Sequence, residues 1–475
     1  MATNLSTLSN ILKEYYLGPV TEQLNNEVLL LSRLESKSED LVGRRAYVPL
    51  HYGRSAGVGA RAEAAALPTA GNQQYEKAVY DLKYLYGRIE VTGPSMAKTK
   101  NEAGAFLQAL KSELDGIRND LRKDLARQVY GKGDARITSA SAVTGTGGVT
   151  WTGQNEVVRK GQVYPGMIVY VNAVTGSTTP AYTGAGIAAG PNWGGTSPDT
   201  KAFRISSVDI VAGTFTFEAA PTSGGASGSA TSFAAGDFIT RAGVSSYAPV
   251  ETPTGSNPGT NALSDEVDGL QRIVADTATA FGGIDAALTG KSWWDNQRVA
   301  LGSTTDQRQN NTDPKGITGA ISTGTDGYQN LTFSAVQQGL NQARIAGGMP
   351  SSIVTSFGVQ REFYSLFTTQ VQYIDPKTLD YAQGFKTLSY NGMPVIADIE
   401  APYGKMYILD ESTLKVYSDQ DWHFLDADGL TLRQVTGYDK FEAVMARYMN
   451  LGATRRNNQV VLTGITVDGK TDQGY

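Results

Sequence analysis

Only a few residues of this chain have side chains that could carry out covalent chemistry. Residues 53–57 match G-x-S-x-G, a pattern that places a nucleophilic Ser, here Ser55, on a sharp turn between a strand and a helix. The residues that follow are Gly-Val-Gly-Ala rather than a helix, and the only His downstream is His423. The pattern therefore favours a loop at the end of a hairpin. A serine hydrolase remains a remote alternative.

Sites for metals, nucleotides and other cofactors have equally little support. The chain has no Cys and only two His residues, His51 and His423, which leaves little material for zinc sites or a general base. Residues 426–429 begin like a calcium loop but lack its third acidic residue and its terminal Glu. Residues 184–189 match G-x-G-x-x-A without a leading strand or a following helix. We expect turns at both places, and no catalytic residue, cofactor or metal.

Two pairs of neighbouring side chains could instead recognise another molecule. Trp293 and Trp294 could stack on a sugar or a base, although paired aromatic residues beside Gly-rich chain are more often core or interface residues. Arg455 and Arg456 could pair with a carboxylate or a phosphate of a neighbour. A single Arg pair is weak support for DNA binding.

The charge balance argues against a dedicated nucleic-acid-binding protein. There are 41 Lys and Arg residues against 46 Asp and Glu residues, a net charge of −5 at pH 7. Because affinity for DNA grows with the number of phosphates that are neutralised, we expect only weak binding. Gly is abundant, at 54 of 475 residues, and charged residues make up 18% rather than the usual ~25%. Such a chain has many turns and large, weakly charged surfaces.

Neither a membrane span nor a signal peptide is expected. No segment has the ~18 consecutive apolar residues of a transmembrane helix. Residues 1–10 lack the basic region and the apolar core of a signal peptide. We therefore expect synthesis in a reducing cytoplasm, which is also consistent with the absence of Cys.

The N-terminal part is predicted to lack a core of its own. Residues 21–35 carry an apolar stripe at helical spacing, whereas residues 1–20 show no comparable period. Residues 44–52 and 75–93 look extended, and we expect them to form a long hairpin with a flexible tip. One face of its second strand is predicted to hold four apolar side chains: Tyr80, Leu82, Tyr84 and Tyr86. An isolated hairpin is marginally stable in water, so this one needs a partner surface.

A long helix and a β-rich region are predicted to follow. Apolar residues keep a helical period from Phe106 to Val129, which predicts one helix of roughly 50 Å that ends at Gly131. From there to residue 250 the chain is rich in Gly, Ser and Thr, with short runs of β-forming residues. Its aromatic residues, such as Trp151 and Phe215, could fill a core. An all-β insert is therefore favoured over a low-complexity linker.

The remainder predicts a mixture of helices and strands. Helices are expected over residues 265–278, 333–346 and 359–369. Asn391 and Gly392 lie between two extended runs, a strong signal for a two-residue hairpin turn. Further strands are expected over residues 353–355, 406–409, 414–417, 430–434 and 441–451. The chain is thus predicted to have an α+β fold.

In their order along the chain, these features resemble the major capsid protein of tailed bacteriophages, the Hong Kong ninety-seven type of fold. The stretches that carry the resemblance are residues 87–94, 281–285 with the Trp pair that follows, 350–355, 390–395 and 448–464. Each stretch is modest alone, and their order makes the case. The region after Gly131 departs from the simplest pattern of the family.

The resemblance implies a division of the chain into an N-terminal arm (1–35), an extended E-loop hairpin (36–93), a spine helix of the peripheral domain (94–131), an inserted β-domain (132–249), a mainly axial domain with peripheral connections (250–415) and a C-terminal return to the peripheral domain (416–475). In this family the arm and the E-loop reach adjacent subunits. No long charged helical segment precedes the arm, so a fused scaffolding region is not expected.

The resemblance further implies a structural protein rather than an enzyme. Pentamers and hexamers of the chain would form an icosahedral or prolate shell around phage double-stranded DNA, in a virion assembled in the host bacterial cytoplasm. Portal, scaffolding and decoration proteins would be its partners. The side chains expected to contact neighbouring subunits are Tyr80, Tyr84, Arg88, Trp293, Trp294, Arg455 and Arg456. The alternative from another class is an adhesive or carbohydrate-binding β-protein, suggested by the Gly- and Thr-rich insert.

Overall fold

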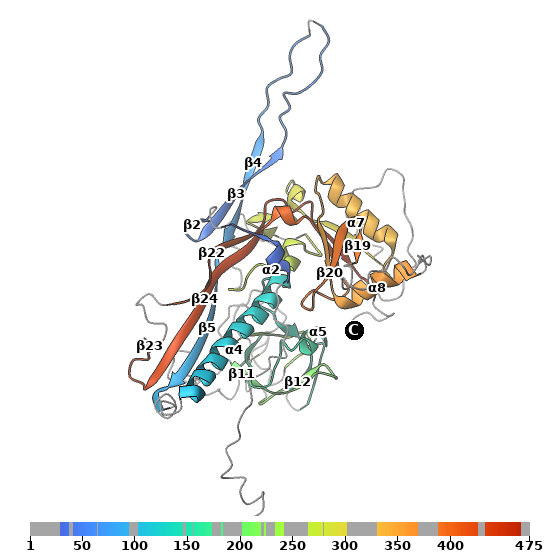
Figure 1. The fold of residues 1–475 in the computed structure, drawn as a ribbon. Helices are drawn as coiled ribbons and strands as arrows, with labels where there is room; N and C mark the ends of the chain where they lie inside the picture. The colour runs from blue at the N-terminus through green and yellow to red at the C-terminus, as the bar shows by residue number, and fades with distance from the viewer. Residues whose placement is uncertain are drawn as a thin grey trace, which may run out of the picture. The chain divides into compact units, whose positions relative to one another are not determined.

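The computed structural model describes most of the chain, and Figure 1 colours it from blue at the N-terminus to red at the C-terminus. The described residues are 29–37, 41–63, 65–94, 103–145, 149–153, 155–172, 182–183, 202–219, 223–224, 233–241, 265–278, 280–301, 330–368, 388–425 and 433–466. The first of two compact units contains Leu85–Lys123 and Trp422–Arg447; the second contains Val28–Tyr84, Asp124–Asp421 and Tyr448–Tyr475. The predictions for residues 1–28, 184–189 and 426–429 lie outside the described residues.

The second unit contains the predicted hairpin. Its strands are β2 (Leu41–Val42), β3 (Arg45–Gly53) and β4 (Gln74–Asp81), in the order β2-β3-β4. The antiparallel register of β3 and β4 is regular as far as the pair His51 and Tyr75, and it shifts before Gly53. Figure 1 shows the hairpin and its loop, residues 54–73, extending away from the sheets of this unit.

In the first unit, a long helix packs on a strand. The elements are β5 (Lys83–Thr92), β23 (Arg433–Gln434), β24 (Lys440–Ala453) and α4 (Ala103–Tyr130). Strand β5 belongs to this unit from Leu85, β24 as far as Arg447 and α4 as far as Lys123. Strand β24 pairs with both β5 and β23. Helix α4 approaches β5 so closely at Gly87 that a Cβ there would lie 2.6 Å from Cδ1 of Leu121. The described part of the predicted long helix is therefore helical, and α4 ends directly before Gly131.

The prediction that Tyr80, Leu82, Tyr84 and Tyr86 share one face of a single strand is wrong. Strand β4 ends before Leu82, and β5 begins directly after it. Tyr80 is buried, whereas Tyr84 and Tyr86 are 47% and 56% exposed, and Leu85 between them is buried. The alternation of side chains therefore changes phase at Leu82. A strand keeps one set of side chains on one face only while it continues without a break.

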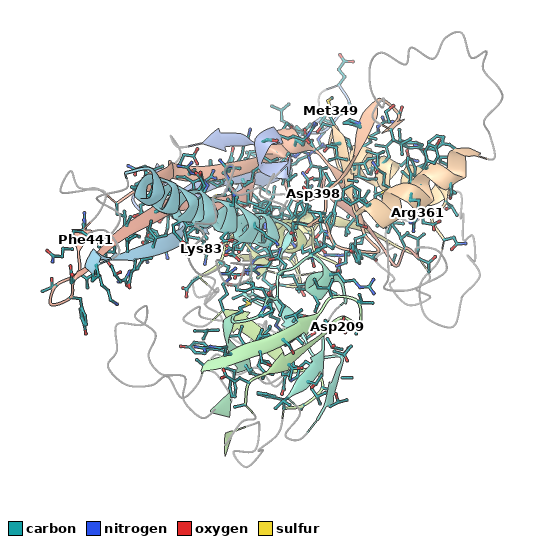
Figure 2. All side chains as sticks on the ribbon, turned by 60° about the horizontal axis from the view of Figure 1, so that its bottom comes forward. Lys83, Asp209, Met349, Arg361, Asp398 and Phe441 are labelled. Carbon is teal, nitrogen blue, oxygen red and sulfur yellow. The ribbon has the colours of Figure 1, made fainter. Side chains whose placement is uncertain are left out.

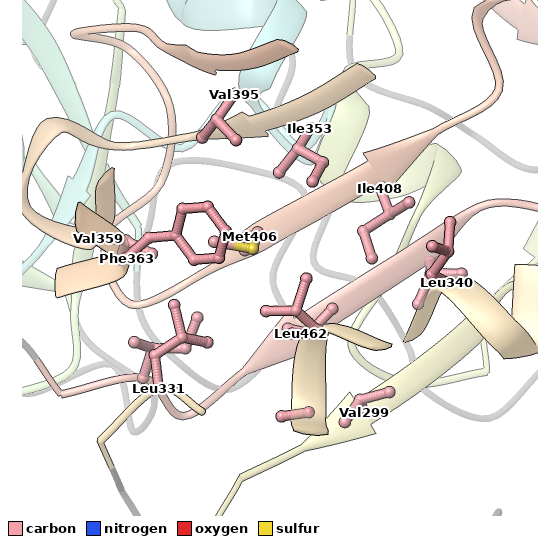
Figure 3. Packing of buried hydrophobic residues seen from close by; sticks show 14 of the residues in the cluster. Val299, Leu331, Leu340, Ile353, Val359, Phe363, Val395, Met406, Ile408 and Leu462 are labelled. Atoms are coloured by element: carbon pink, nitrogen blue, oxygen red, sulfur yellow. The ribbon is translucent and has the colours of Figure 1, made fainter. Parts of the chain in front are cut away.

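One sheet of the second unit has six strands and is covered by two helices. In sheet order the strands are β17 (Gln297–Ala300), β25 (Val460–Thr463), β21 (Met406–Leu409), β18 (Ser352–Thr355), β20 (Met393–Ala397) and β19 (Ser389–Tyr390), and the helices are α7 (Phe333–Ile345) and α8 (Phe357–Thr368). Leu340 of α7 and Phe363 of α8 belong to one core with Ile353 and Ile408 (Figure 3). Because Ile353 and Ile408 are cross-strand partners, both helices cover the same face of the sheet.

Residues 137–241 contain a sheet that closes on itself, here called the closed sheet. Its strands, in sheet order, are β6 (Thr138–Ser139), β14 (Phe238–Arg241), β9 (Ile168–Asn172), β11 (Ala202–Asp209), β12 (Thr214–Phe217), β8 (Thr150–Thr152) and β7 (Ala142–Thr144). Only Ala140 and Ser141 separate its two end strands. The amide of Ala140 donates to the carbonyl of Asp237, and that of Ser141 to the carbonyl of Thr152. One bent segment thus pairs with both ends of the sheet, which protects its edges.

Aromatic side chains fill the inside of the closed sheet. Trp151 has no exposed surface, and its ring meets those of Phe217 and Phe233 edge-on at 5.2 and 5.4 Å. Figure 2 shows this sheet with its side chains, where Asp209 marks the end of β11. The described elements of the region are mostly strands, but the short helix α5 (Asn155–Arg159) departs from the all-β prediction. Of the described aromatic residues of this region, Trp151, Phe203, Phe215, Phe217 and Phe233 form the core, whereas Tyr164 is 47% exposed.

The other described elements are α2 (Leu29–Arg33), β1 (Glu35–Lys37), α5 (Asn155–Arg159), β10 (Tyr182–Thr183), β13 (Ser223–Gly224), α6 (Leu270–Ile273), β15 (Ala280–Phe281), β16 (Ile284–Asp285), η2 (Ser292–Trp294), η5 (Glu411–Thr413) and β22 (Leu414–Phe424). Strand β22 pairs in parallel with β1 and lies next to β24 in the sheet. A helix is predicted over residues 21–35; of its described residues, 29–35, only those of α2 are helical.

The helix predicted over residues 265–278 is reduced to the single turn α6. Before that turn, the amide of Val267 donates to the side-chain oxygen of Gln128. After it, the amide of Ala275 donates to the side-chain oxygen of Asn296. Backbone groups on both sides of α6 thus bond to side chains from elsewhere in the unit. These tertiary hydrogen bonds replace the helical ones that the local sequence favours.

Candidate assembly surfaces

The two faces of the hairpin differ in exposure. On one face, Ala46, Val48 and Leu50 are buried. On the other face, Tyr47 and Tyr75 are 42% and 70% exposed. This alternation follows the period of two that a strand imposes. The outward face therefore offers aromatic side chains to solvent.

Polar groups accompany the aromatic rings of the outward face. The Nζ atom of Lys77 lies 5.6 Å from the ring centre of Tyr47. The rings of His51 and Tyr75 are 5.1 Å apart, and Nε2 of His51 lies 2.7 Å from Oε1 of Gln73. Tyr residues with a few polar neighbours are enriched in protein–protein interfaces.

The loop at the end of the hairpin carries two highly exposed apolar side chains. Val58 is 87% exposed and Leu67 is 85% exposed. Each would gain about 25 cal/mol for every Å² of apolar surface that a partner covers. The loop is therefore a candidate contact with another molecule.

Ser55 holds the two sides of this loop together. Its hydroxyl donates to the carbonyl of Gly71 at 2.8 Å and accepts from the amide of Gly57 at 3.1 Å. The residues after Ser55 are loop rather than helix. The serine thus has a structural role in the loop, and the strand-to-helix turn that a hydrolase needs is not formed.

Two of the predicted contact residues lie at the surface on β5. Tyr84 is half exposed, and its ring meets that of Tyr448 edge-on at 5.3 Å. The Arg88 guanidinium lies 2.6 Å from a carboxylate oxygen of Glu90 and 2.6 Å from one of Glu442. Such exposed ion pairs contribute little to stability, so Arg88 is available to a partner at low cost.

Tyr80 is placed differently from the expectation. Its side chain is 2% exposed, its hydroxyl donates to the carbonyl of Ala453 at 2.7 Å, and its ring stacks on Tyr417 at 5.4 Å. Burial raises the pKa of Tyr80. Tyr80 is therefore a core residue of this unit and is not available to contact a neighbouring subunit.

The two Trp residues have separate roles. Trp294 is 2% exposed, and its indole N–H donates to the carbonyl of Phe281 at 2.9 Å. Trp294 is therefore also removed from the expected contacts. Trp293 is half-buried, and it stacks on Tyr52 of the hairpin with ring centres 4.6 Å apart and planes 7° apart.

The two Arg residues both bind the carboxyl ends of helices. Arg455 is exposed and donates from its two terminal nitrogens to the carbonyls of Gly347 at 3.1 Å and Ala346 at 3.0 Å, directly after α7. Arg456 has no exposed surface and donates from Nε to the carbonyl of Ile273 at 2.6 Å, at the end of α6. The last carbonyls of a helix have no partner within the helix, and the Arg side chains satisfy them here.

The burial of Arg456 contradicts its expected role at a surface. Desolvation lowers its pKa to about 10, although the carboxylate of Asp295 acts in the opposite direction. A guanidinium enclosed in this way cannot reach a phosphate or carboxylate of a neighbour. Arg456 is therefore a structural residue.

Sequence reasoning missed three residues that hold the hairpin. These are Tyr52, Glu76 and Lys291. Lys291 forms an ion pair with Glu76, from which it is separated by 215 positions in the sequence. No sequence pattern connects residues so far apart, and only the fold brings them together.

A buried ion network supports the C-terminal end of α4. Arg127 donates to Asp124 from Nη2 at 3.2 Å and also forms an ion pair with Glu266, and all three side chains are at most 16% exposed. Burial disfavours the charge on Arg127, but the two carboxylates outweigh it and raise its pKa. Arg241 of the closed sheet reaches the same Asp124 at 3.2 Å. The network thus joins the helix to the closed sheet.

The described part of the chain offers neither a cluster of metal ligands nor a membrane-spanning helix. Within it, no cluster of three or more His, Asp or Glu side chains is arranged to hold a metal ion. Its helices are all too short or too polar to cross a membrane.

Comparisons with known proteins support the fold. No family model and no curated protein matches the chain. The capsid asymmetric unit of cyanophage A-1(L) matches with a TM-score of 0.54 at 14% identity, over 98% of this chain and 100% of that chain. Two looser matches are the capsid of a native GTA particle (TM-score 0.44, 9% identity, 98% and 100% covered) and a structure of Mycobacterium phage Bobi (TM-score 0.40, 9% identity, 98% and 99% covered). The first match shows a shared fold over nearly the whole chain.

Proposed function

We propose, on the basis of its tailed-phage major capsid fold, that this chain is the structural subunit of a phage shell. Pentamers and hexamers would form a closed icosahedral or prolate shell that encloses double-stranded DNA. The protein would act by self-association, without turnover. The observation that carries the proposal is the match of nearly the whole chain to a capsid asymmetric unit.

The hairpin supports self-association as the function. It exposes aromatic residues along one face and two apolar residues at its end, Val58 and Leu67. In the proposed assignment the hairpin is the E-loop, α4 is the spine helix and the closed sheet is an inserted β-domain. A second copy of the chain would cover the surfaces that the hairpin leaves open.

Four of the expected inter-subunit contacts remain in the proposal. Tyr84, Arg88 and Arg455 are exposed, and Trp293 is half-buried beside the hairpin. Portal, scaffolding and decoration proteins are the proposed further partners. The proposed location is the virion, after assembly in the host bacterial cytoplasm.

The enclosed DNA would be confined by the shell and only weakly bound by its wall. With a net charge of −5, free subunits should bind DNA no more tightly than the ~10⁻⁴ to 10⁻⁶ M of non-specific binding. An anisotropy titration of free subunits measures this. Nanomolar binding with a steep salt dependence would contradict the proposal.

Negative-stain microscopy of the purified chain tests the proposal directly. Closed shells, or rings of five and six subunits, support it, and monomers under all assembly conditions contradict it. Ester hydrolysis that is lost in a Ser55→Ala variant would instead favour the hydrolase alternative.

The role of the hairpin tip is tested by the double variant Val58→Ser and Leu67→Ser. Both residues are so exposed that the free energy of unfolding should change by less than about 0.5 kcal/mol, while shells should become fewer or absent. The matched control is Ile210→Ser with Val211→Ser, which removes two exposed apolar side chains from a turn of the closed sheet. Normal assembly of the tip variant would refute the role of the tip.

A further inference from the structure

The hairpin is held by a second segment of its own unit, residues 280–294, here called the support segment. The segment begins with a tight turn at Gly282 and Gly283, whose φ angles are 61° and 77°. The carbonyl of Gly282 accepts a hydrogen bond from the amide of Val79 in β4 at 2.9 Å. A Cβ at Gly282 would lie 3.1 Å from the ring of Tyr80, so the turn approaches the hairpin closely.

A second contact lies further along the hairpin towards its loop. Lys291 of the support segment forms an ion pair with Glu76 of β4. The two side chains are 32% and 26% exposed, so solvent screens part of the attraction. The pair mainly fixes which part of the support segment lies beside Glu76.

The third contact lies next to the loop and depends on an irregularity of the strand. The register of β3 and β4 shifts between His51 and Gly53, so β3 is irregular at Tyr52. A bulge of this kind turns a side chain in a new direction. Here it directs Tyr52 onto Trp293, and the two rings stack at 4.6 Å.

The support segment is itself fixed to the core. Phe281 has no exposed surface and Trp294 has 2%. The indole of Trp294 donates to the carbonyl of Phe281, which joins the two ends of the segment. The Arg456 guanidinium lies 5.6 Å from the Phe281 ring centre. Both ends of the segment are therefore anchored in the core.

From these contacts we propose that the support segment fixes the direction of the hairpin, and that Trp293 and Lys291 are positioning residues for shell assembly. The three contacts are spread along the hairpin from Val79 to Tyr52. A hairpin held at several levels cannot pivot about its base, whereas an unsupported hairpin is only marginally stable. The loop would thus be presented to a second copy of the chain in one direction. This inference rests on the proposed function.

The direction of the hairpin can be measured in free subunits with spin labels. Because the chain has no Cys, the variant Val58→Cys with Ile345→Cys carries one label on the hairpin loop and one on α7, at residues that are 87% and 70% exposed. In this background, Trp293→Ala with Lys291→Met should broaden the distribution of distances between the labels. Exchange of the Val79 amide should become roughly two- to twelve-fold faster, the range expected from the loss of one aromatic pair.

The matched control is Leu288→Ala. It also truncates an apolar side chain of the support segment, but Leu288 is 52% exposed. Its distance distribution and its amide exchange should equal those of the parent. If the double variant does not fold, Tyr52→Ala removes the same ring stack from the hairpin side, where Tyr52 is 38% exposed.

Two results would overturn the inference. The first is an unchanged distance distribution in a folded variant that lacks the stack and the ion pair. The second is a broadened distribution together with normal shell assembly, because the direction of the hairpin would then be irrelevant to assembly. Failure of the proposed function gives a different result: the parent chain forms no shells, while the distribution still broadens in the double variant.

Discussion

Replacement of Arg127 by Met should destabilise the chain strongly. Arg127 is the cation shared by Asp124 and Glu266, and its side chain is 11% exposed. Met has a similar length and fills a similar space without the charge. The substitution therefore removes the ion pairs and changes the packing little.

The magnitude follows from what each carboxylate keeps after the substitution. Asp124 retains Arg241 at 3.2 Å and the side-chain amide of Gln128 at 2.9 Å. Glu266, with a side chain 7% exposed, loses the ion pair with Arg127. A buried charge that loses its partner typically costs about 3–5 kcal/mol of the free energy of unfolding. We expect a loss in this range, mostly from Glu266.

Urea unfolding followed by circular dichroism measures this loss. The matched control is Arg118→Met on the same helix, where the ion pair with Asp115 spans 3.7 Å and both side chains are about half exposed. The control should change the free energy of unfolding by less than about 0.5 kcal/mol. Adding Glu266→Gln to Arg127→Met should restore part of the loss, because the buried charge is then removed.

The pH dependence gives a second check with a definite sign. Burial raises the pKa of Glu266, and the loss of Arg127 would raise it further. A carboxyl group whose pKa is higher in the folded state binds more protons there, so its charge costs less as the pH falls. The deficit of Arg127→Met should therefore shrink between pH 7 and pH 5. A loss equal to that of Arg118→Met at all pH values would refute this reasoning.

Three further predictions concern other parts of the chain. Gly269→Ala should prevent folding, because a Cβ there would lie 2.2 Å from a carbonyl oxygen of α4. In contrast, a Cβ at Gly116 of α4 would meet no atom within 4 Å, so Gly116→Ala should stabilise the chain by about 0.5–1 kcal/mol in urea unfolding. Burial opposes the charge of Asp124, but two Arg side chains outweigh the burial and lower the pKa of this carboxyl group. The stability that the Asp124 carboxylate contributes is therefore lost as the pH falls below about 4. Asp124→Asn should flatten the curve of stability against pH in that range. Residues 132–249 expressed alone should show a β-type spectrum and a cooperative melt, and a disordered spectrum would contradict a separate domain.

Much of the local structure could be predicted because it depends on local rules. The turn at Asn391 and Gly392 forms as predicted, with φ angles of 51° and 81° that few other residue pairs adopt easily. Helix α7 ends where Gly347 follows it, since Gly tolerates the φ of 80° found there. The hairpin and the long helix follow from side-chain periods of two and 3.6.

Local rules failed where distant side chains form hydrogen bonds with the backbone of a predicted helix, or where a predicted strand is interrupted. The helical pattern over residues 265–278 is overridden because side chains such as Gln128 and Asn296 bond its amides. The break at Leu82 shifts the alternation of buried and exposed side chains, and no residue type in this stretch predicts the break. The closed sheet likewise depends on pairing between strands far apart in the chain, such as β6 and β14.

The sequence by itself determined the α+β composition, the hairpin with its exposed end, and the scarcity of groups for catalysis. The tertiary structure alone decided which candidate residues are available to a partner. Tyr80, Trp294 and Arg456 are buried, whereas Tyr84 and Arg455 are exposed. The physical reason is that burial and hydrogen bonding depend on groups brought from distant parts of the chain. Residues of the same type, even neighbours such as the two Arg residues, therefore receive different environments.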